Sequence, residues 1–370
     1  MPTRLPTTVA MVTEQCWQRV PGGSATYVVE LSRALADRDD TRLVGVTALH
    51  RRGDVPRPGL EPTVDRSAVA PLPRAALYRA WNRVGAPRPE QLARGVDVVH
   101  ATTWAVPPTR RPLVVTVHDV AFLTEPEHFT ARGVGWFRRG LQRVVAEADA
   151  VVVPSRATWQ ECVAAGIEPG RLRLVPHGVR VVRAEPGAVE AFRRRQGLSR
   201  PYVLWTGTLE PRKNVGALLT AFERLTAADP GLDLDLVLVG PTGWGDVPRP
   251  ASDRVRRLGR LSPADLACAY EGARAFCFPS TREGFGMPVL EAMAHGVPVV
   301  TSAGTSMAEV AGDDALLADP RDPDAIAAQL LRAVGADHDA LAAAGLRRAG
   351  ERTWAQAAAA TVEVYRTAAG

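Results

Sequence analysis

Lysine is almost missing from this sequence of 370 residues. Of its 45 basic residues, 44 are arginine and only one, Lys213, is lysine. The lysine ammonium is a compact, flexible point charge, whereas the arginine guanidinium is a planar fork. That position 213 keeps lysine in such a chain indicates that its role requires a point charge. A lysine that survived by chance is the alternative.

Cysteine and long apolar runs are scarce as well. The four cysteines show neither CxxC nor metal-ligand spacing, which excludes a disulfide framework and predicts reduced, packed thiols. No apolar run approaches the roughly 18 residues of a membrane span, and the apolar stretch at the N-terminus is too short for a signal peptide. We therefore expect a cytoplasmic protein. The cysteines are Cys16, Cys162, Cys268 and Cys277.

The net charge of +5 is unevenly distributed. Residues 1–180 hold 24 arginines against 17 acidic residues, whereas residues 181–370 hold 21 basic against 23 acidic residues. A basic first half favours an anionic acceptor, a membrane surface or nucleic acid as partner. An arginine-rich soluble surface is the plain alternative.

Strand-like apolar runs alternate with amphipathic helical stretches along the chain, which predicts parallel sheets covered by helices. A chain of this length suits two domains of about 150–200 residues each. We expect an α/β protein with an N-terminal domain at 1–180 and a C-terminal domain at 181–350. A hinge at 177–190 and a C-terminal helix at 351–370, packing back toward the first domain, complete this prediction. The expected strands are 7–12, 97–100, 113–119 and 150–155, then 202–208, 234–240, 275–279 and 297–301.

The most informative segment is EGFGMPVLE (283–291), which leaves a strand, crosses a glycine-bearing loop and enters a helix. Glycine lets a backbone approach a ligand closely, and the first turn of a helix favours anions such as phosphate. The carboxylates of Glu283 and Glu291 suit hydroxyl groups, one on a sugar and one on a ribose. A turn followed by an amphipathic helix with an incidental Glu291 is the alternative.

This segment resembles the E-x7-E motif of glycosyltransferase family 4. Further similarities to that family lie in GTLEPRKN (207–214), HGV (177–179), residues 278–320, HAT (100–102) and TVHD (116–119). The chain is identified as a member of this family, whose members have the GT-B fold. The resemblance implies two facing Rossmann-like domains with a cleft between them. The N-terminal domain (1–180) would bind the acceptor, and the C-terminal domain (181–350) would bind the nucleotide-sugar.

The resemblance implies a role for each matching residue. Glu283 would bind a hydroxyl of the donor sugar, and Glu291 would bind the ribose. Lys213 and Arg212 would neutralise the diphosphate leaving group, which is electrostatic stabilisation in a closed cleft.

The first loop departs from the family in one position. Many members carry arginine directly after the glycine of this loop, but here Thr208 follows Gly207, so more of the cationic role falls to Arg212 and Lys213. The remaining donor contacts implied by the resemblance are Gly284, Phe285, Gly286 and Met287, with Gly22 and Gly23 as a flexible loop near the phosphates.

Three residues at strand ends of the first domain are further candidates. In the family a histidine equivalent to His118 contacts the donor sugar near the reacting carbon, and a structural histidine is the alternative. Asp119 either caps the following turn or touches a substrate. His100 either contacts the acceptor or packs inside the domain.

The implied function is transfer of a hexose, with retention, from a nucleotide-diphosphate sugar to an acceptor hydroxyl. GDP-mannose is the leading donor, because GTLEPRKN resembles mannosyltransferases and other hexosyltransferases. The acceptor would belong to polysaccharide, glycolipid or glycoconjugate synthesis, and we expect no cofactor. A phosphorylase, a nucleotide-sugar epimerase and a basic non-enzymatic binding protein are the alternatives. A pyridoxal phosphate Schiff base on Lys213 is disfavoured by the neighbouring Arg212.

Two stretches, 74–84 and 134–145, combine aromatic residues with arginines at helical spacing. Such helices either lie on anionic lipid at the inner face of a membrane or pack as ordinary surface helices. Asp233 and Asp235 form a D-x-D pair that could hold a metal ion. Because the pair begins an apolar strand, we expect no metal there, and scattered arginines without a groove-reading motif predict no specific nucleic acid.

Overall fold

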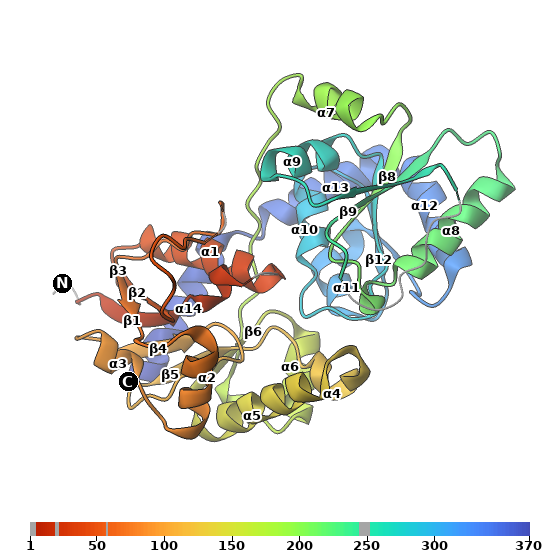
Figure 1. The fold of residues 1–370 in the computed structure, drawn as a ribbon. Coiled ribbons are helices and arrows are strands. Elements are labelled where there is room, and N and C mark those ends of the chain that lie inside the picture. The colour runs from red at the N-terminus through yellow and green to blue at the C-terminus, as the bar shows by residue number, and fades with distance from the viewer. Residues whose placement is uncertain (1–4, 19–21, 57, 244–251) are drawn as a thin grey trace. The chain divides into compact units, whose positions relative to one another are not determined.

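A computed structural model describes residues 5–18, 22–56, 58–243 and 252–370. The chain divides into two compact units (Figure 1). The first consists of residues 1–178 together with 353–370, and the second consists of residues 179–352. The first change of unit lies inside the segment 177–190, in which the sequence shows no buried pattern.

The first unit is built on a parallel sheet with the strand order β3-β2-β1-β4-β5-β6-β7. Parallel neighbours need crossover connections, which the helices of this unit provide. The strands are β1 (Thr7–Val12), β2 (Thr41–Thr47), β3 (Arg66–Val69), β4 (Val98–Ala101), β5 (Leu113–Thr116), β6 (Ala150–Val153) and β7 (Leu172–Leu174). The helices are α1 (Gly22–Ala36), α2 (Arg74–Arg83), α3 (Pro89–Leu92), α4 (Ala121–Thr124), α5 (Ala131–Glu147), α6 (Arg156–Ala164) and α14 (Trp354–Ala369), with 3-10 turns at η1 (Glu14–Trp17), η2 (Pro126–His128) and η3 (Pro169–Arg171).

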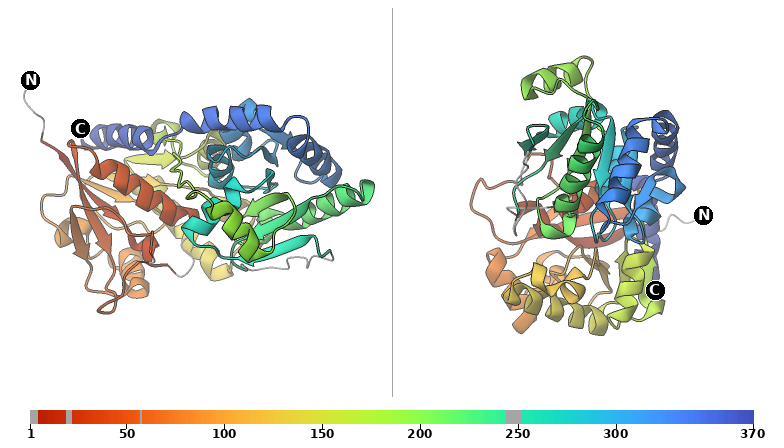
Figure 2. Two further views of the ribbon diagram at one scale, coloured as in Figure 1. Left: turned by 90° about the horizontal axis from the view of Figure 1, so that it is seen from above. Right: turned by 90° about the vertical axis from the view of Figure 1, so that its right-hand side faces the viewer.

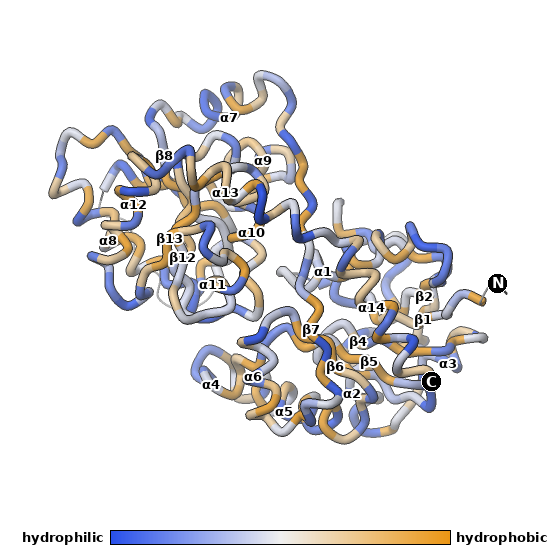
Figure 3. Tube along the Cα trace, turned by 180° about the vertical axis from the view of Figure 1, so that it is seen from behind, coloured by the Kyte–Doolittle hydropathy of each residue, from blue (hydrophilic) through white to orange (hydrophobic). Residues whose placement is uncertain are grey.

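Both faces of this sheet are buried, as strand β1 illustrates. Val9 and Met11 belong to the hydrophobic cluster that α1 and α14 cover. Ala10 and Val12 point to the other face and join the cluster that contains residues of α2 and α5. Successive side chains of a strand alternate between faces, so a parallel strand with helices on both sides is apolar throughout. Figure 3 shows such a hydrophobic stretch along β5, whereas surface helix α7 (Ala188–Gln196) alternates.

Helix α14 belongs to the first unit although it ends the chain. It lies beside α1 (Figures 1 and 2), and both contribute to one hydrophobic cluster. The hydroxyl of Tyr365 lies 2.7 Å from Nδ1 of His100 in β4. The other ring nitrogen of His100 lies 2.8 Å from the hydroxyl of Thr116 in β5. These buried hydrogen bonds tie the last helix to the two central strands.

The second unit has a parallel sheet of its own, with the order β10-β9-β8-β11-β12-β13. The predicted pair of doubly wound parallel sheets is therefore confirmed. The strands are β8 (Tyr202–Thr206), β9 (Asp235–Val239), β10 (Val255–Gly259), β11 (Ala275–Phe278), β12 (Val299–Ser302) and β13 (Leu316–Ala318). The other elements are α7, α8 (Val215–Ala228), α9 (Pro263–Glu271), α10 (Met287–Ala294), α11 (Ser306–Ala311), α12 (Pro323–Val334), α13 (His338–Gly350), η4 (Pro211–Lys213) and η5 (Gly312–Asp314).

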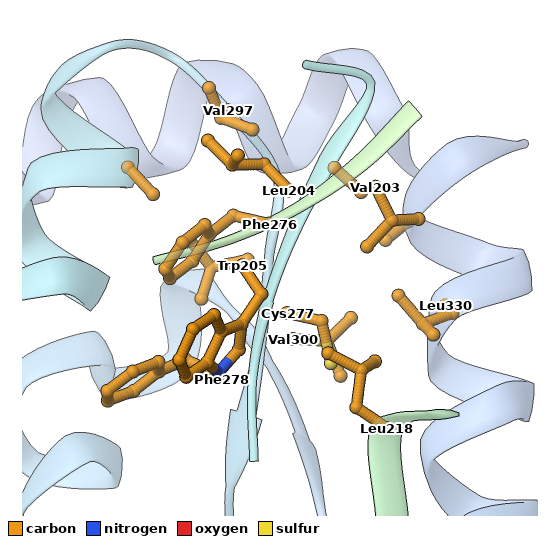
Figure 4. Close-up of a cluster of buried hydrophobic side chains, with 14 of the residues drawn as sticks. Val203, Leu204, Trp205, Leu218, Phe276, Cys277, Phe278, Val297, Val300 and Leu330 are labelled. Atoms are coloured by element: carbon orange, nitrogen blue, oxygen red, sulfur yellow. The ribbon is translucent and has the colours of Figure 1, made fainter. Parts of the chain in front are cut away.

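Strand β11 shows how the core of the second unit is packed. Phe276 and Phe278 lie on one side of the sheet with their rings stacked 6.0 Å apart (Figure 4). Cys277 points to the other side, toward Leu218 of α8 and Leu330 of α12. Burying each large side chain of this kind contributes roughly 1.5–3 kcal/mol, so this core fixes the strand ends that follow.

Candidate active site

The connections of the second sheet reverse direction between β8 and β11, which are neighbours in the sheet. In sheets of this type ligands bind beyond the carboxyl ends of the strands, at the point where the order reverses. Strand β8 ends at Thr206 and strand β11 ends at Phe278. The predicted donor residues lie in the loops that follow these two strands and in the helix α10 beyond the second loop.

The loop after β8 is held against the end of β9. Gly207 donates to the carbonyl of Val239 at 2.9 Å, and Leu209 donates to the carbonyl of Pro241 at 3.0 Å. A Cβ atom on Gly240 would lie 1.8 Å from the carbonyl oxygen of Gly207, so only glycine allows this approach. The loop is thereby fixed where it passes Thr208 and enters the turn η4.

Turn η4 brings both predicted cations to one carboxylate. The ammonium of Lys213 lies 2.5 Å from Oε1 of Glu283, and the guanidinium of Arg212 lies 3.1 Å from Oε2. Arg212 also pairs with Glu210 at 2.8 Å. Lys213, the lone lysine, is only 8% exposed. The structure therefore brings together the three catalytic residues that the sequence predicts in the second unit.

Hydroxyl and backbone groups hold this cluster in place. The hydroxyl of Ser280 lies 2.8 Å from Oε1 of Glu283, and Ser306 donates to the Glu283 carbonyl at 2.6 Å. The amide of Thr281 donates to the carbonyl of Arg212 at 2.9 Å. The loops after β8 and β11 are thus joined directly, and the carboxylate has a fixed orientation.

Asn214 joins a third loop to the other two. Its backbone is left-handed, with φ 54°, which asparagine tolerates better than most residues. Its side-chain amide donates to the carbonyl of Pro279 at 3.0 Å and to that of Pro320 at 2.7 Å. The residue beside Lys213 therefore ties together the loops after β8, β11 and β13.

The charges of this cluster are set by burial and by one another. Burial raises the pKa of Glu283, but the positive charges of Arg212 and Lys213 outweigh it and bring the pKa to about 2. Burial lowers the pKa of the Lys213 ammonium, and the carboxylate of Glu283 opposes that shift. Near neutral pH the carboxylate is ionised, and its charge opposes the loss of the Lys213 proton.

The predicted glycine loop leads into helix α10. Gly286 has φ 99°, and a Cβ atom there would lie 2.6 Å from Cγ of Met307. Helix α10 then begins at Met287 with proline in its first turn, where the missing N–H costs nothing. The side chain of Phe285 is 7% exposed and packs in the core, so a donor contact of this residue falls to its backbone, as it does for Gly284.

The second predicted carboxylate, Glu291, lies on α10 in a different environment. The hydroxyl of Tyr270 in α9 donates to its Oε2 at 3.0 Å. The same hydroxyl lies 2.9 Å from Oγ1 of Thr206, the last residue of β8. Glu291 is therefore linked to the strand end that precedes Gly207.

His118 and Asp119 follow β5 in the first unit. Nε2 of His118 lies 3.0 Å from the carbonyl of Thr102, to which it donates, and the ring meets Tyr27 edge-on at 4.9 Å. Burial lowers the pKa of His118, and the charge of Asp119 opposes this shift, so the ring is neutral. Asp119 accepts a hydrogen bond from the amide of Ala121 at 3.0 Å, which is the capping arrangement. The role of His118 toward a donor sugar stays a prediction.

His100 takes the packing alternative. It lies inside β4, not beyond its end, and it is fully buried. Both ring nitrogens are engaged, by Tyr365 and Thr116. Burial, followed by the charge of His118, lowers the pKa of His100 to about 3. His100 is therefore not an acceptor contact, because β4 continues to Ala101, one residue beyond the strand end that the sequence predicts.

Gly22 and Gly23, which the resemblance places in a flexible loop, are the first residues of helix α1. Both glycines are exposed. Gly22 has φ 61° with nothing within 4 Å of an added Cβ atom. The open space leaves room for a ligand, and contact of this turn with phosphates stays a prediction.

The large aromatic and leucine side chains of the two aromatic stretches are buried or half-buried, whereas Val84 is exposed. In α2, Leu77 and Trp81 are buried. Tyr78 of α2 stacks on Trp136 of α5 with ring centroids 6.0 Å apart. Packing within the first unit accounts for these residues. Among the helices of the described ranges, none combines the length and apolarity required to cross a bilayer.

The D-x-D pair is engaged by an arginine. Arg200 lies 3.0 Å from Asp233 and 3.3 Å from Asp235. An arginine shared by both carboxylates favours a structural ion pair at the start of β9. Across residues 5–18, 22–56, 58–243 and 252–370, no group of three or more histidine, cysteine or acidic residues is arranged to hold a metal ion.

Several residues of the site were not predicted from the sequence: Ser280, Ser306, Asn214, Gly240 and Tyr270. Ser280 and Gly240 follow the ends of apolar strands, so their position was a usable signal. Tyr270 lies inside a helix and looks like an ordinary core residue. Only the tertiary fold shows that its hydroxyl reaches Glu291.

Two family models match the chain, one for each unit. The model described as Glycosyltransferase Family 4 matches residues 21–183. The model described as Glycosyl transferases group 1 matches residues 200–335. The second match contains all of the residues around Glu283 and Lys213.

Curated relatives agree with these matches. The O-antigen chain mannosyltransferase B of Escherichia coli is 32% identical, over 73% of this chain and 74% of the relative. A D-inositol 3-phosphate glycosyltransferase of Geodermatophilus obscurus is 33% identical, over 94% of this chain and 85% of the relative.

Among solved structures, HepE of Anabaena in complex with UDP and glucose has a similar fold. Its TM-score is 0.74 at 19% identity, with 98% of this chain and 100% of that chain covered. At this identity the likeness shows the fold alone. With the family models and the relatives, it confirms the resemblance found in the sequence: the chain belongs to the family 4-like, group 1 glycosyltransferases and has their GT-B fold.

Proposed function

We propose that this glycosyltransferase moves a hexose from a nucleotide-diphosphate sugar to an acceptor hydroxyl with retention, with GDP-mannose as the leading donor. The observation that supports it most is the pair of cations, Lys213 and Arg212, on the carboxylate of Glu283 at the carboxyl ends of β8 and β11. The E. coli relative, a mannosyltransferase, supports mannose as the sugar.

The cations are the groups that would bind the diphosphate. An ammonium has three donors and a guanidinium has five, so the contacts to Glu283 use only part of their capacity. The buried setting strengthens their attraction to the charge that develops on the leaving phosphate. Lysine suits a position where a phosphate must be met by a point charge from a loop.

Glu283 would accept a hydroxyl of the donor sugar. Because two cations already engage its oxygens, it is a poor nucleophile and is suited to accepting hydrogen bonds. We therefore propose a mechanism without a covalent enzyme intermediate. The bond from the anomeric carbon to the phosphate oxygen breaks, the acceptor oxygen attacks on the same face, and the departing phosphate takes the acceptor proton.

The acceptor would bind on the first unit, which contains all but two of the residues 1–180 that hold the excess of arginine. The relative that acts on D-inositol 3-phosphate supports an acceptor that is a small, hydroxyl-rich and anionic molecule. We propose a role in polysaccharide, glycolipid or glycoconjugate synthesis, with a glycan, lipid-linked or small-molecule acceptor. His118, Asp119, Gly22 and Gly23 remain the proposed substrate contacts of this unit. The four buried, unpaired cysteines support a cytoplasmic site of action.

The proposal is tested with a panel of nucleotide-sugars and two substitutions. Slow hydrolysis of one donor by the wild-type protein identifies the sugar and the nucleotide. Lys213→Ala and Glu283→Gln should each reduce turnover of that donor at least a hundredfold with the fold intact. The first removes a cation at the leaving group, and the second removes the carboxylate that would bind the donor sugar. Lys213→Arg should lose less turnover than Lys213→Ala, because the positive charge is kept. It should still lose some, since a planar fork replaces the point charge.

Arg224→Ala is the matched control, because it removes a positive charge from an ion pair on α8 and should keep near-normal turnover. Near-full turnover of both Lys213→Ala and Glu283→Gln at saturating donor would contradict the site. Phosphate acting in place of the acceptor would identify a phosphorylase instead, and a new nucleotide-sugar formed without acceptor would identify an epimerase.

A further inference from the structure

The turn after β1 contains a buried carboxylate that the proposed donor site does not use. Glu14 begins the 3-10 turn η1 and is buried. Its Oε2 accepts a hydrogen bond from the amide of Ala48 at 2.8 Å and lies 3.0 Å from Nε2 of His50. Strands β1 and β2 are parallel neighbours. Glu14, Ala48 and His50 therefore meet beyond the carboxyl ends of these strands, where sheets of this type bind ligands.

The carboxylate of Glu14 is incompletely paired. Its Oε1 is buried and has no hydrogen-bond partner in the part of the chain that the structure describes. The same holds there for Nε1 of Trp17, the last residue of η1. Burying a polar atom without a partner destabilises a fold. A carboxylate that is kept at this cost points to a role other than stability.

A second histidine pair in the first unit shows what is unusual about this one. His128 lies 3.0 Å from the carboxylate of Glu125, the same separation as between His50 and Glu14. The two histidine side chains are exposed to a similar extent, 20% for His128 and 21% for His50. The Glu125 side chain is 19% exposed, however, whereas that of Glu14 is only 1% exposed. The first is an ordinary surface pair, and the second joins a buried carboxylate to a partly exposed imidazole.

The contacts of the His50 ring fix its proton and its plane. Oε2 of Glu14 already accepts from Ala48, so Nε2 of His50 is assigned as a donor, and in the neutral ring Nδ1 is left as an acceptor. Trp17 stacks on this ring with centroids 5.0 Å apart and an angle of 15°. Both rings are half-buried, whereas Glu14 is covered. A ligand would therefore meet the two rings and not the carboxylate.

We propose that His50 and Trp17 form an acceptor contact, in which Nδ1 of His50 accepts a hydrogen bond from a hydroxyl-bearing ring and Glu14 acts as a positioning residue. This inference rests on the proposed function, because it names residues that would hold the acceptor on the first unit. The faces of aromatic rings are negative and attract the weakly positive C–H groups of a sugar or polyol ring. The hydroxyls of such a ring are the donors that Nδ1 requires.

Binding is tested with two probes, methyl α-mannoside and myo-inositol, on protein labelled with 15N in tryptophan and histidine. At least one probe, at high millimolar concentration, should shift the indole N–H signal of Trp17, which Trp17→Phe identifies. His50→Ala should weaken this binding about fivefold, since it removes one hydrogen bond. His128→Ala is the matched control and should bind the probe as the wild type does.

The positioning role of Glu14 is measured on the tautomer of His50. Long-range proton–nitrogen spectra at alkaline pH should show the wild-type ring with its proton on Nε2. Glu14→Gln should give a mixture of both tautomers, because an amide offers a donor as well as an acceptor. The same variant should weaken probe binding about fivefold. A purely structural role of Glu14 would change the stability of the protein without moving the ring proton.

None of these measurements uses the nucleotide-sugar, so failure of this inference is distinguishable from failure of the proposed function. No shift of the Trp17 signal with either probe, or equal binding by the wild type and His50→Ala, overturns the acceptor contact. A wild-type His50 ring with its proton on Nδ1 overturns the positioning role of Glu14. Should His50→Ala not fold, His50→Phe replaces it, because it keeps a ring on Trp17 and lacks Nδ1. Undiminished probe binding by that variant overturns the contact as well.

Discussion

Glu283 and Lys213 depend on each other for their charge. Burial alone would favour a neutral carboxyl and a neutral amine, and each charge offsets that tendency in the other. Arg212 adds a second cation on the same carboxylate. Both cations keep N–H donors that the contacts to Glu283 do not use, which would suit a leaving group that becomes more negative.

The free energy of unfolding at acid pH should depend on the ion pairs of Glu283 with Lys213 and Arg212. The pKa of Glu283 is about 2 in the folded protein against an ordinary value of 4.5. Because the folded value is the lower one, the stabilisation is fully present above pH 4.5 and is lost as the pH falls toward 2. Its size is on the order of 3 kcal/mol. Glu283→Gln should be less stable than wild type at pH 7.

Urea unfolding of the wild type and of Glu283→Gln between pH 7 and pH 2 measures the difference in their free energies of unfolding. The gap in unfolding free energy should narrow between pH 4.5 and pH 2, since only the wild type loses the ionised carboxylate. Arg224→Ala serves again as the control and should show no such convergence. A gap that stays constant across this range would mean that the carboxylate of Glu283 is not held at a low pKa.

At the scale of elements, the site depends on how three loops are tied together by Asn214. Its left-handed backbone and its two side-chain hydrogen bonds are separable contributions. Asn214→Gly keeps the backbone conformation and loses the two bonds. Asn214→Ala loses the bonds and adds the cost of a left-handed alanine, about 1 kcal/mol.

In urea unfolding, the wild type should therefore have the highest free energy of unfolding, Asn214→Gly a lower one and Asn214→Ala the lowest. Each lost hydrogen bond to a buried carbonyl costs about 1 kcal/mol. Both variants should also lose turnover, because Lys213 is the preceding residue. Equal stability of the two variants would show that the backbone conformation at Asn214 carries no cost.

Elements with continuous apolar sequence were predictable, and half-exposed ones were not. Strands β8 and β11 are buried throughout, so their residues show unbroken apolar runs. Edge strands β3 and β10 are largely exposed and carry arginine, which hides them among loops. The same distinction holds in the site: Glu283 and Lys213 stand out by motif and composition, whereas Tyr270 acts through a contact that only the packed helices create.

At the scale of the whole molecule, the chain leaves the first unit after Gly178 and returns to it at Thr353. These two points touch within the first unit. The ring of His177 stacks on Trp354 with centroids 5.7 Å apart. Trp354 begins α14, which carries Tyr365 to His100. Residues 177 and 178 therefore fix the start of the helix that completes the core of the first unit.

Gly178 lies against the backbone at the start of α14, so an added side chain there should disturb the docking of this helix. A Cβ atom there would lie 2.2 Å from the backbone nitrogen of Trp354 and 2.4 Å from the carbonyl carbon of Thr353. Backbone atoms cannot move aside as a flexible side chain does, so Gly178→Ala should destabilise the first unit by about 3 kcal/mol or more. Gly350→Ala, with nothing within 4 Å of the added carbon, should leave stability unchanged or slightly raised. Limited proteolysis and urea unfolding measure both variants, and equal behaviour of the two would mean that α14 docks without the close approach at Gly178.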